Sequence, residues 1–498
     1  MTKKIFFWLD ADLIQFCLAY YLQKNYTGDF FAIIDITNKP KKFFKEQKFV
    51  KFTKFWFYHD HIKTNKNADL NYLENFQKKY DIDLFELANH DRILKKYNDF
   101  YDFSDNEIYS ILEHECKFFE KVLDDVQPDF FITGETALQP HHLFYEICKR
   151  KGIKVLMLNH ANWKRLCYIS ETRHKIDDFK EISKEEYQDC NFKDLQKLLE
   201  ESKVSKSHKE YHSKVKNSKL FRLNAAIKYL LSDNSNTKTH YTYFGRSKLR
   251  VLYNEIQHSK KKKQRERFIE SNLLKKLNQT KPFVYMPLHE EPERSLLIAA
   301  PKFSDQIKTI KEVVKNLPTN YELYVKEHPT QGPSRGWREI SFYEEIINLQ
   351  NVKLFHPNLD SKILLKNCEL VISVGGSTSF EAAFFGKPSI IFADLGYSVI
   401  PSIIKLNSYD ELNNGIKNAL KTHVNPNHVA NYIRTLEKNS FNFDYLTILS
   451  NYLNWFYING NYVDVIIENY KMEKFLFDNK NEFELLGREH LKKIEQHK

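Results

Sequence analysis

The sequence predicts an α/β protein with two layered domains, each built from parallel strand–helix–strand units. Two series of short apolar runs that alternate with amphipathic segments support this class, one at the start of the chain and one beginning near residue 280. A chain of 498 residues also exceeds the usual length of a single domain. Glycine (13) and proline (14) are too scarce for a collagen-like or low-complexity architecture.

The first series defines an expected domain at residues 1–165. We expect its strands at 3–9, 29–35, 127–135 and 153–160, and helices at 12–24 and 140–152. The second series defines an expected domain at residues 271–407. We expect its strands at 281–289, 321–329, 351–357, 369–376 and 389–394, and helices at 304–317, 361–368 and 379–388. Ligands of such domains bind at the carboxyl ends of the strands, so the residues there are the functional candidates.

A lysine-rich segment separates the two domains. Residues 166–270 have a mainly helical pattern and predict a basic insertion or linker. Within it, residues 203–270 hold 18 basic and 5 acidic residues, which accounts for the whole net charge of +11. The excess peaks at Lys260, Lys261, Lys262, Lys263, Arg265 and Arg267. Such a segment is either a solvated helical face or a contact for an anionic membrane surface or an acidic polymer. Aromatic residues are not regularly interleaved with the charges, so no nucleic acid is expected.

Cysteine usage and hydropathy indicate a cytoplasmic protein. None of the six cysteines forms a C-x-x-C pair or lies at zinc-ligand spacing from a histidine, which favours a reducing compartment. Asp10 and Asp12 interrupt the apolar run at the N-terminus, so we expect no signal peptide. No apolar stretch approaches the ~18 residues of a membrane helix. His141, His142 and His160 lack convincing ligand spacing, and we expect no metal site.

The sharpest motif lies at residues 369–392. An expected buried strand ends at Gly375 and Gly376, and Ser377, Thr378 and Ser379 open the following helix. Glycines allow a ligand to approach the backbone, and free N–H groups and hydroxyls at a helix N-terminus favour phosphate. Glu381 follows where a carboxylate can accept hydrogen bonds from a ribose. The alternative is a helix capped by Ser377 or Thr378.

A second motif follows the strand expected at 321–329. Lys326 and His328 are two residues apart and therefore share one face of that strand, and Pro329 ends it. A cation and an imidazole at this position could hold a diphosphate or a leaving phosphate. The alternative is a histidine packed at the end of a strand.

Carboxylates follow strands in both domains. His289, Glu290 and Glu291 come after the first strand of the second domain and are candidates for acceptor or sugar binding. In the first domain, Asp10 follows the first strand and Glu135 follows the strand at 127–135. Either carboxylate could act as a general base, whereas Asp12 is expected to cap its helix.

These segments, in this order, resemble a known family. PFVYMPLHEEPE at 282–293, FSDQ at 303–306, YVKEHP at 324–329 and GGSTSFEA with FGKPSIIF at 375–392 are similar to segments of capsular polysaccharide biosynthesis proteins. These are GT-B-type glycosyltransferases that include β-Kdo transferases. The resemblance covers residues 280–395; the first domain matches only in its α/β pattern.

The resemblance implies two Rossmann-like domains that face a central cleft, with the helical tail at 408–498 crossing back to the first domain. It implies that the second domain binds a nucleotide sugar, with His328 and Pro329 on the nucleotide phosphate. Ser377, Thr378 and Ser379 would also bind phosphate, and Glu381 the nucleoside. A base from the first domain, Asp10 or Glu135, would deprotonate the acceptor.

The function expected is therefore a metal-independent glycosyltransferase of surface polysaccharide. It would transfer a sugar, such as an ulosonic acid from a CMP-sugar, to a glycan or lipid-linked acceptor, with no cofactor besides the donor. We expect it in the cytoplasm, with peripheral contact to the membrane through residues 203–270. Alternatives are a polyol-phosphate transferase or a sugar-nucleotide epimerase of the same fold, or a non-catalytic protein that binds polysaccharide or nucleic acid.

Overall fold

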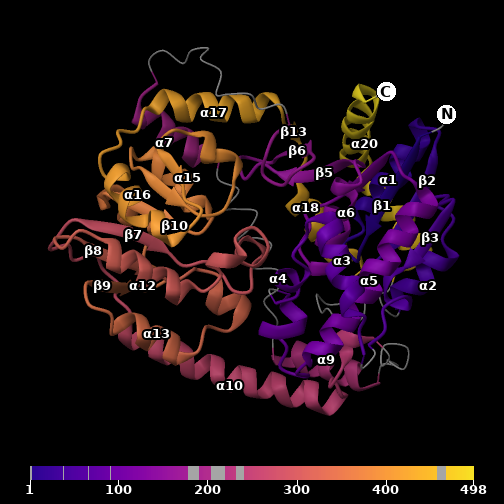
Figure 1. Ribbon diagram of the computed structural model, residues 1–498, viewed down its shortest axis with the longest axis horizontal. Helices are drawn as coiled ribbons and strands as arrows, with labels where there is room; N and C mark the ends of the chain where they lie inside the picture. Colours follow the sequence, from indigo (N-terminus) through magenta and orange to yellow (C-terminus); the bar gives the residue numbers. More distant parts are fainter. Residues whose placement is uncertain are drawn as a thin grey trace. The chain divides into compact units, whose positions relative to one another are not determined.

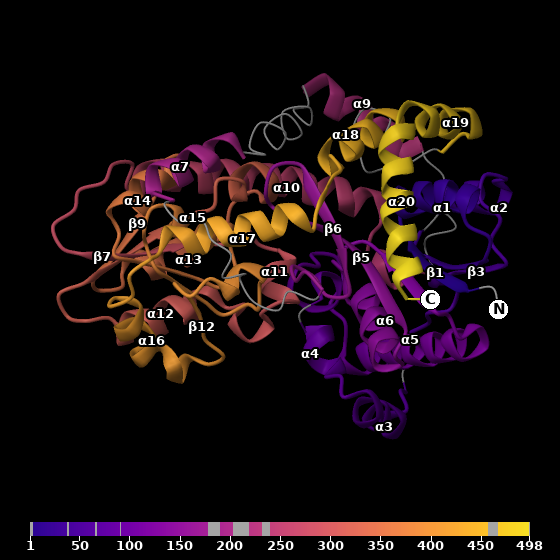
Figure 2. The ribbon, with the colours of Figure 1, turned by 90° about the horizontal axis from the view of Figure 1, so that it is seen from above.

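The chain divides into two compact units, each with its own sheet (Figures 1 and 2). The computed structural model describes residues 3–36, 39–64, 67–89, 91–177, 190–202, 219–231, 240–456 and 467–497. Unit 1 comprises Met1–Asp177, Lys203–Val251 and Asn439–Lys498, and unit 2 comprises Asp178–Ser202 and Leu252–Lys438. Residues 178–189, 203–218 and 232–239 of the predicted basic segment lie outside the described residues. None of the described helices is both long enough and apolar enough to cross a bilayer.

Unit 1 is built on a seven-stranded sheet in the order β13-β6-β5-β4-β1-β2-β3. Its strands are β1 (Lys4–Leu9), β2 (Asp29–Ile34), β3 (Lys54–Phe57), β4 (Phe130–Thr133), β5 (Lys154–His160), β6 (Leu166–Ser170) and β13 (Phe441–Asn442). The five strands from β5 to β3 are parallel. This arrangement has the strand order of dinucleotide-binding sheets, in which the order reverses between the first and fourth strands, here β1 and β4.

Both faces of this sheet are covered, as the alternation in β1 requires. Phe7 and Leu9 pack on one face, and Phe6 and Trp8 pack on the other. The helices of unit 1 are α1 (Ile14–Asn25), α2 (Lys39–Glu46), α3 (Leu70–Tyr80), α4 (Leu84–Asn89), α5 (Asp105–Val126), α6 (Gln139–Arg150), α9 (Lys219–Leu231), α18 (Tyr445–Phe456), α19 (Asn469–Asp478) and α20 (Lys480–Gln496).

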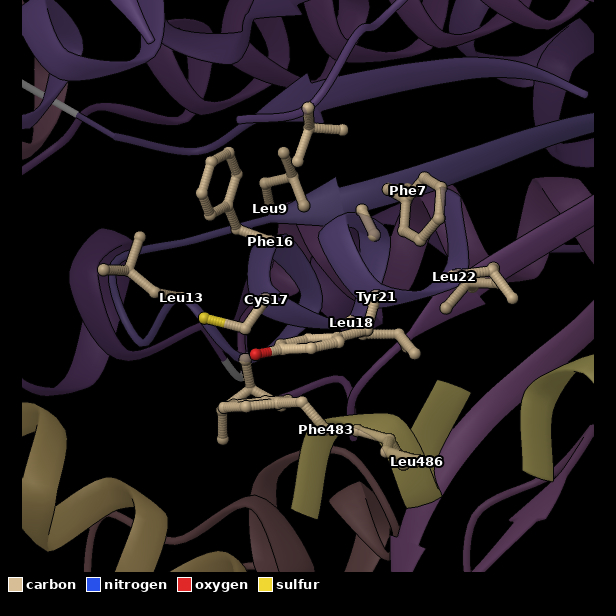
Figure 3. Close-up of a cluster of buried hydrophobic side chains, with 14 of the residues drawn as sticks. Phe7, Leu9, Leu13, Phe16, Cys17, Leu18, Tyr21, Leu22, Phe483 and Leu486 are labelled. Atoms are coloured by element: carbon tan, nitrogen blue, oxygen red, sulfur yellow. The ribbon is translucent and has the colours of Figure 1, made fainter. Parts of the chain in front are cut away.

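The C-terminal helices complete the core of unit 1. Phe483 and Leu486 of α20 lie against α1, where the ring of Phe483 stacks on Tyr21 with centroids 6.2 Å apart (Figure 3). The Tyr21 hydroxyl donates a hydrogen bond of 2.5 Å to the carbonyl of Leu476. Residues 439–498 are therefore part of the first unit's core rather than a separate appendage.

Unit 2 is built on a six-stranded sheet in the order β12-β11-β10-β7-β8-β9, with all strands parallel. Its strands are β7 (Phe283–Pro287), β8 (Glu322–Lys326), β9 (Val352–Phe355), β10 (Leu370–Ser373), β11 (Ser389–Ile391) and β12 (Ile403–Lys405). Its helices are α7 (Phe192–Glu201), α11 (Arg294–Leu297), α12 (Gln306–Asn316), α13 (Ile340–Ile347), α14 (Ser361–Asn367), α15 (Ser377–Phe384), α16 (Leu412–Ala419) and α17 (Pro426–Lys438). Helix α10 (Lys248–Asn272) begins in unit 1 and continues into unit 2. In this sheet the order reverses between β7 and β10.

The α/β class and the two Rossmann-like sheets are confirmed, while the predicted boundaries differ from the observed units. A boundary at 165 would cut off β6, which pairs antiparallel with β5. Residues 166–270 are shared between the two units instead of forming one insertion, because β6 and α9 belong to unit 1 and α7 to unit 2. The tail is not divided at 407, since α16 and α17 remain in unit 2.

Candidate functional site

The three central strands of unit 2 bring most of the predicted residues to one edge of the sheet. His289 follows β7, His328 follows β8, and Gly375 follows β10. Strand β7 lies between β10 and β8, and all three are parallel, so these carboxyl ends are neighbours. The point between β7 and β10 is where the strand order reverses, which is where ligands of such sheets bind.

A direct contact joins β7 and β10 at this point. The backbone N–H of Gly375 donates to Nε2 of His289 over 3.2 Å. With Nε2 accepting, the proton of this imidazole is on Nδ1, which lies 3.4 Å from a carboxylate oxygen of Glu293. The His289 side chain is buried, so it shapes the floor of the site. His289 therefore has a structural role at this edge of the sheet, and its contact with a sugar stays a prediction.

The N-terminus of α15 opens directly beside this contact. Gly376 is its N-cap and no side chain caps it, so the predicted capping by Ser377 or Thr378 is wrong. The hydroxyl of Tyr397 donates to the carbonyl of Gly376 over 2.7 Å and fixes the turn. Ser377 is exposed and Thr378 is half-buried. In the part of the chain that the structure describes, the first two amides of this helix, those of Ser377 and Thr378, have no protein acceptor, an arrangement that suits an anion.

The other two predicted residues of α15 have protein partners. Ser379 is fully buried, and its hydroxyl lies 2.8 Å from that of Ser373 in β10. This position corrects the prediction that Ser379 offers a hydroxyl to phosphate, because one turn of helix carries it into the core. Glu381 is half-buried and accepts a hydrogen bond of 3.1 Å from Ser377.

His328 is accessible on one side only. Its imidazole is 38% exposed, and Nδ1 lies 2.8 Å from the Thr330 hydroxyl, which in turn donates to Glu290. Nε2 of His328 has no hydrogen-bond partner among the described residues. Partial burial lowers the pKa of His328, although the carboxylates of Glu293 and Glu290 oppose this shift. Pro329 is exposed, but β8 already ends at Lys326, so the prediction that Pro329 ends the strand is wrong by three residues.

Lys326 is a buried cation that lacks a matching anion. The residue is only 2% exposed, and within the described part of the chain its ammonium makes no hydrogen bond. Burial lowers the pKa of Lys326 to about 8, and the charges of Glu327 and Asp360 only partly offset this effect. A bound anion would stabilise the charged form of this buried ammonium more than it would stabilise an exposed lysine.

A buried ion network, which the sequence did not reveal, holds the loops after β7 and β8 together. Arg338 donates to Glu327 over 2.9 Å, to Glu291 over 2.5 Å, and to the carbonyl of His289. Glu327 is fully buried and also accepts from the Tyr343 hydroxyl (2.7 Å). In the sequence, the one feature that pointed to a residue such as Arg338 was the presence of several carboxylates near buried strands, since buried carboxylates require a cation.

This network changes the roles expected for two carboxylates. Glu291 pairs with Arg338 and accepts a hydrogen bond of 2.7 Å from the side-chain amide of Gln306. Glu290 pairs with Arg335 over 2.7 Å. Both side chains therefore support the strand-end loops, and neither presents an unpaired carboxylate for a sugar or an acceptor.

In unit 1, the order of the sheet reverses between β1 and β4, and the predicted residues Asp10 and Glu135 follow these two strands. Asp10 accepts from the N–H of Asp12 over 3.1 Å, and Asp12 accepts from the N–H of Ile14 over 2.9 Å. The N-cap of α1 is Leu13 and has no side-chain cap, so the predicted cap by Asp12 is wrong, although Asp12 accepts from the first amide of the helix. Burial and then the neighbouring Asp12 carboxylate raise the pKa of Asp10 well above its ordinary value.

Glu135 has a different environment. It accepts from Arg173 over 2.7 Å and from the N–H of His160 over 3.2 Å. Its two carboxylate oxygens are therefore both engaged by protein donors. Tyr445, at the start of α18, donates to Asp12 over 3.3 Å and lies edge-on to His160. Neither Arg173 nor Tyr445 could be found from local pattern, because each is distant in sequence from the strands it joins.

No group of three or more histidine, cysteine or acidic side chains in the described part of the chain is arranged to hold a metal ion.

The comparisons with known proteins bear on unit 2. Residues 187–400 match the family model of capsule polysaccharide biosynthesis proteins. The predicted resemblance is thus confirmed over a range that contains every unit 2 residue discussed above, whereas Asp10 and Glu135 lie outside it. No curated protein matches the chain in sequence.

Solved structures with distant similarity include sugar-nucleotide epimerases and glycosyltransferases. The UDP-GlcNAc 2-epimerase of Methanocaldococcus jannaschii is 13% identical over 87% of this chain and 99% of that chain, with a TM-score of 0.26. The β-Kdo 2,7 transferase KpsC of Thermosulfurimonas dismutans is 11% identical over 64% and 79%, with a TM-score of 0.30. A glycosyltransferase of Rickettsia africae is 13% identical over 91% and 99%, with a TM-score of 0.25. TM-scores this low assign neither fold nor activity to this chain.

Proposed function

We propose that the protein is a glycosyltransferase of capsular or other surface polysaccharide, and that unit 2 binds the phosphate of its nucleotide-sugar donor. The observation that carries the proposal is the convergence at the edge of β10, β7 and β8. There, the N-terminus of α15, which no side chain caps, follows β10; the buried ammonium of Lys326 ends β8; and the partly exposed imidazole of His328 comes two residues after that strand. The family match over residues 187–400 supports the reaction class.

Each of these groups has a part in the proposed chemistry. Glycosyl transfer breaks the bond between the sugar and the nucleotide phosphate, and negative charge grows on that phosphate. Lys326 and the first amides of α15 would stabilise this charge in a site of low dielectric, where fixed dipoles act most strongly. His328 would donate from Nε2 to a phosphate oxygen. In this scheme the protein's own charges, and no metal ion, assist departure of the nucleotide.

The acceptor hydroxyl must lose a proton, and we assign this step to Asp10. Its raised pKa makes it a better proton acceptor near neutral pH than an ordinary carboxylate. Glu135 is less suited because Arg173 and the N–H of His160 stabilise its anionic form. Asp12 and Tyr445 are positioning residues for Asp10 in this scheme.

For the donor, we propose a CMP-linked ulosonic acid, and for the acceptor a glycan or a lipid-linked glycan. The proposal follows the similarity of YVKEHP to the His-Pro segment of CMP-sugar transferases in this family.

Calorimetric titration of CMP, CDP, UDP, GDP and ADP tests the donor site. We expect CMP to bind to the wild type and to be lost in His328→Ala. The matched control is His423→Ala, which removes an exposed histidine of unit 2 outside the site and should bind like the wild type. Selective binding of UDP or GDP would show that the donor is a UDP- or GDP-linked sugar instead of a CMP-linked one. Failure of every nucleotide to bind would overturn the proposal.

Product analysis then tests the reaction class. A new glycosidic bond supports the proposed transferase. A phosphodiester product would identify a polyol-phosphate transferase, and an epimerised sugar nucleotide would identify an epimerase. Substitution of Asp10 by Asn should abolish turnover while leaving CMP affinity unchanged, because the base acts on the acceptor and not on the nucleotide.

A further inference from the structure

Helix α10 has one face that packs against unit 2. At 100° per residue, Lys262, Arg265 and Ile269 fall on the same side of the helix. Nζ of Lys262 donates to the carbonyl of Pro333 over 3.3 Å, and Arg265 donates to the carbonyl of Trp337 over 3.0 Å. Ile269 is fully buried. These contacts attach α10 to unit 2 along this side. The opposite side of the helix faces away from them.

The opposite face carries apolar side chains and then cations at one spacing. Leu249, Tyr253 and Ile256 are 76%, 60% and 56% exposed. The same alternation of four and three residues continues to Lys260, Lys263 and Arg267, which are all exposed. Positions spaced in this way lie within about 40° of one line along the helix, half a turn away from the packed side.

Helix α9 also carries exposed apolar side chains, close to the start of α10. Leu223, Ile227, Leu230 and Leu231 are between 41% and 81% exposed. Nζ of Lys248 donates to the carbonyl of Leu230 over 2.7 Å, so the end of α9 lies at the start of α10 (Figure 1). In the described part of the chain, seven of the fourteen large apolar side chains that are exposed belong to these two helices. Such a concentration is unusual for a surface that faces only water.

We propose that the outward face of α10, with Leu249, Tyr253 and Ile256 followed by Lys260, Lys263 and Arg267, docks on an anionic phospholipid membrane. The leucine, isoleucine and tyrosine side chains would enter the interface between headgroups and acyl chains. Lys260, Lys263 and Arg267 would contact lipid phosphates on the same side. The proposal goes beyond donor binding and is independent of it, since none of these residues belongs to the site in unit 2.

Other occupants fit the surface less well. A second copy of the chain would bring two rows of cations together, which opposes association. An acidic polymer would satisfy Lys260, Lys263 and Arg267 but would leave Leu249, Tyr253 and Ile256 in water. A membrane with anionic lipid accounts for both halves of the surface.

Co-sedimentation with vesicles tests the proposal. We expect the full chain to bind vesicles of phosphatidylcholine with 30–40% phosphatidylglycerol (about a third anionic lipid, as in charged leaflets) and not vesicles of phosphatidylcholine alone. The variant K260Q/K263Q/R267Q should bind about 100-fold more weakly, given ~1 kcal/mol for each basic residue at such a surface. The matched control K366Q/K417Q/K421Q removes three exposed charges elsewhere in unit 2 and should bind like the wild type.

The apolar half is tested by L249S/Y253S/I256S, which should lose about 10-fold or more in vesicle affinity. Its thermal midpoint should match the wild type, because these side chains are exposed. A second measurement uses Tyr253→Trp, whose added indole should shift the protein's emission to the blue on anionic vesicles. Wild-type protein that fails to sediment would overturn the proposal. So would an apolar variant that binds as tightly as the wild type, or an emission spectrum of Tyr253→Trp that vesicles leave unchanged, because the contact would then be with a polyanion alone.

Discussion

Arg338 should be the most sensitive single position in unit 2. Its guanidinium side chain is 4% exposed and donates to two carboxylates, of which Glu327 is completely buried. Replacing Arg338 with Met keeps most of the volume but leaves the charge of Glu327 without its cation. Breaking a buried pair from one side costs about 3–5 kcal/mol. For a unit of this size, that corresponds to a decrease in melting temperature of ~6–20 °C.

Urea denaturation followed by circular dichroism measures this change, with Arg335→Met as the matched control. Arg335 is three residues away and also pairs with a glutamate, but its side chain is 40% exposed. An exposed pair contributes only ~0.2–1 kcal/mol. The free energy of unfolding should therefore fall several times further in Arg338→Met than in Arg335→Met. Equal losses in the two variants would refute the idea that the buried network holds the loops.

A double-mutant cycle with Glu327→Gln sharpens the test. Once Glu327 is neutral, Arg338→Met leaves no buried charge unpaired, so the double variant should lose less than the sum of the two single variants. Contacting residues in one network give interaction energies of ~0.5–3 kcal/mol. The N–H of His328 also donates to Glu327 over 2.6 Å, so the same variants should weaken CMP binding. Strict additivity would show that the residues do not act together.

Three further predictions concern the glycine turn, phosphate binding and acid stability. Gly375→Ala should lower the free energy of unfolding by ~1–3 kcal/mol, because its new Cβ would lie 2.6 Å from Cβ of Ala393. Gly376→Ala should cost clearly less, because the nearest atom to its new Cβ is in the His289 ring, 3.3 Å away. The reverse order of the two losses in urea melts would contradict this prediction. Since burial lowers the pKa of Lys326 to about 8, its charge is lost as pH rises through 8, so CMP affinity by calorimetry should fall from pH 7 to pH 9 in the wild type and stay level in Lys326→Arg. Burial also lowers the pKa of His490 from 6.5 to about 4, so the folded state stays neutral where the unfolded chain binds a proton. Stability should then be complete above pH 6.5 and fall by about 3 kcal/mol as pH drops to 4, a loss that urea melts should find reduced in His490→Leu.

Most strands of the two sheets could be predicted because each of these is a short apolar run with a polar end, whereas β3, β6, β12 and β13 were not expected. Strands β1, β2, β4 and β5 and all the strands of unit 2 except β12 fall inside expected segments. Strand β13 could not be predicted, because two residues, Phe441 and Asn442, become a strand only by pairing with Cys167 and Leu166. No local periodicity reports a partner that is more than 270 residues away along the chain.

The positions of the candidate site residues along the backbone could be predicted from the sequence, but the partners of their side chains could not. His328 and Gly375 were identified because they follow strands, and parallel strands end at one edge. Which strands are neighbours depends on crossover connections, so the contact between His289 and Gly375 required the structure. The carboxylates of Glu290 and Glu291 were placed at the correct edge, but their ion pairs with arginines changed what they can do.

The parallel strands of the two sheets have the same order. The charged groups at the carboxyl ends of these strands can therefore be compared directly. At the point of reversal in unit 1, Asp10 is a carboxylate with a raised pKa, and the nearby cation of Arg173 is already paired with Glu135. In unit 2, the helix that follows β10 at the point of reversal has no side-chain cap, and Lys326, at the end of β8 on the far side of β7, is a buried ammonium without an ion pair among the described residues. Each edge therefore has unsatisfied charge of the opposite sign. A carboxylate with surplus proton affinity suits a hydroxyl group that must be deprotonated, and a buried cation suits a phosphate that must depart. A protein that only bound polysaccharide would need neither of these costly arrangements, since hydrogen bonds and aromatic faces at the surface would suffice.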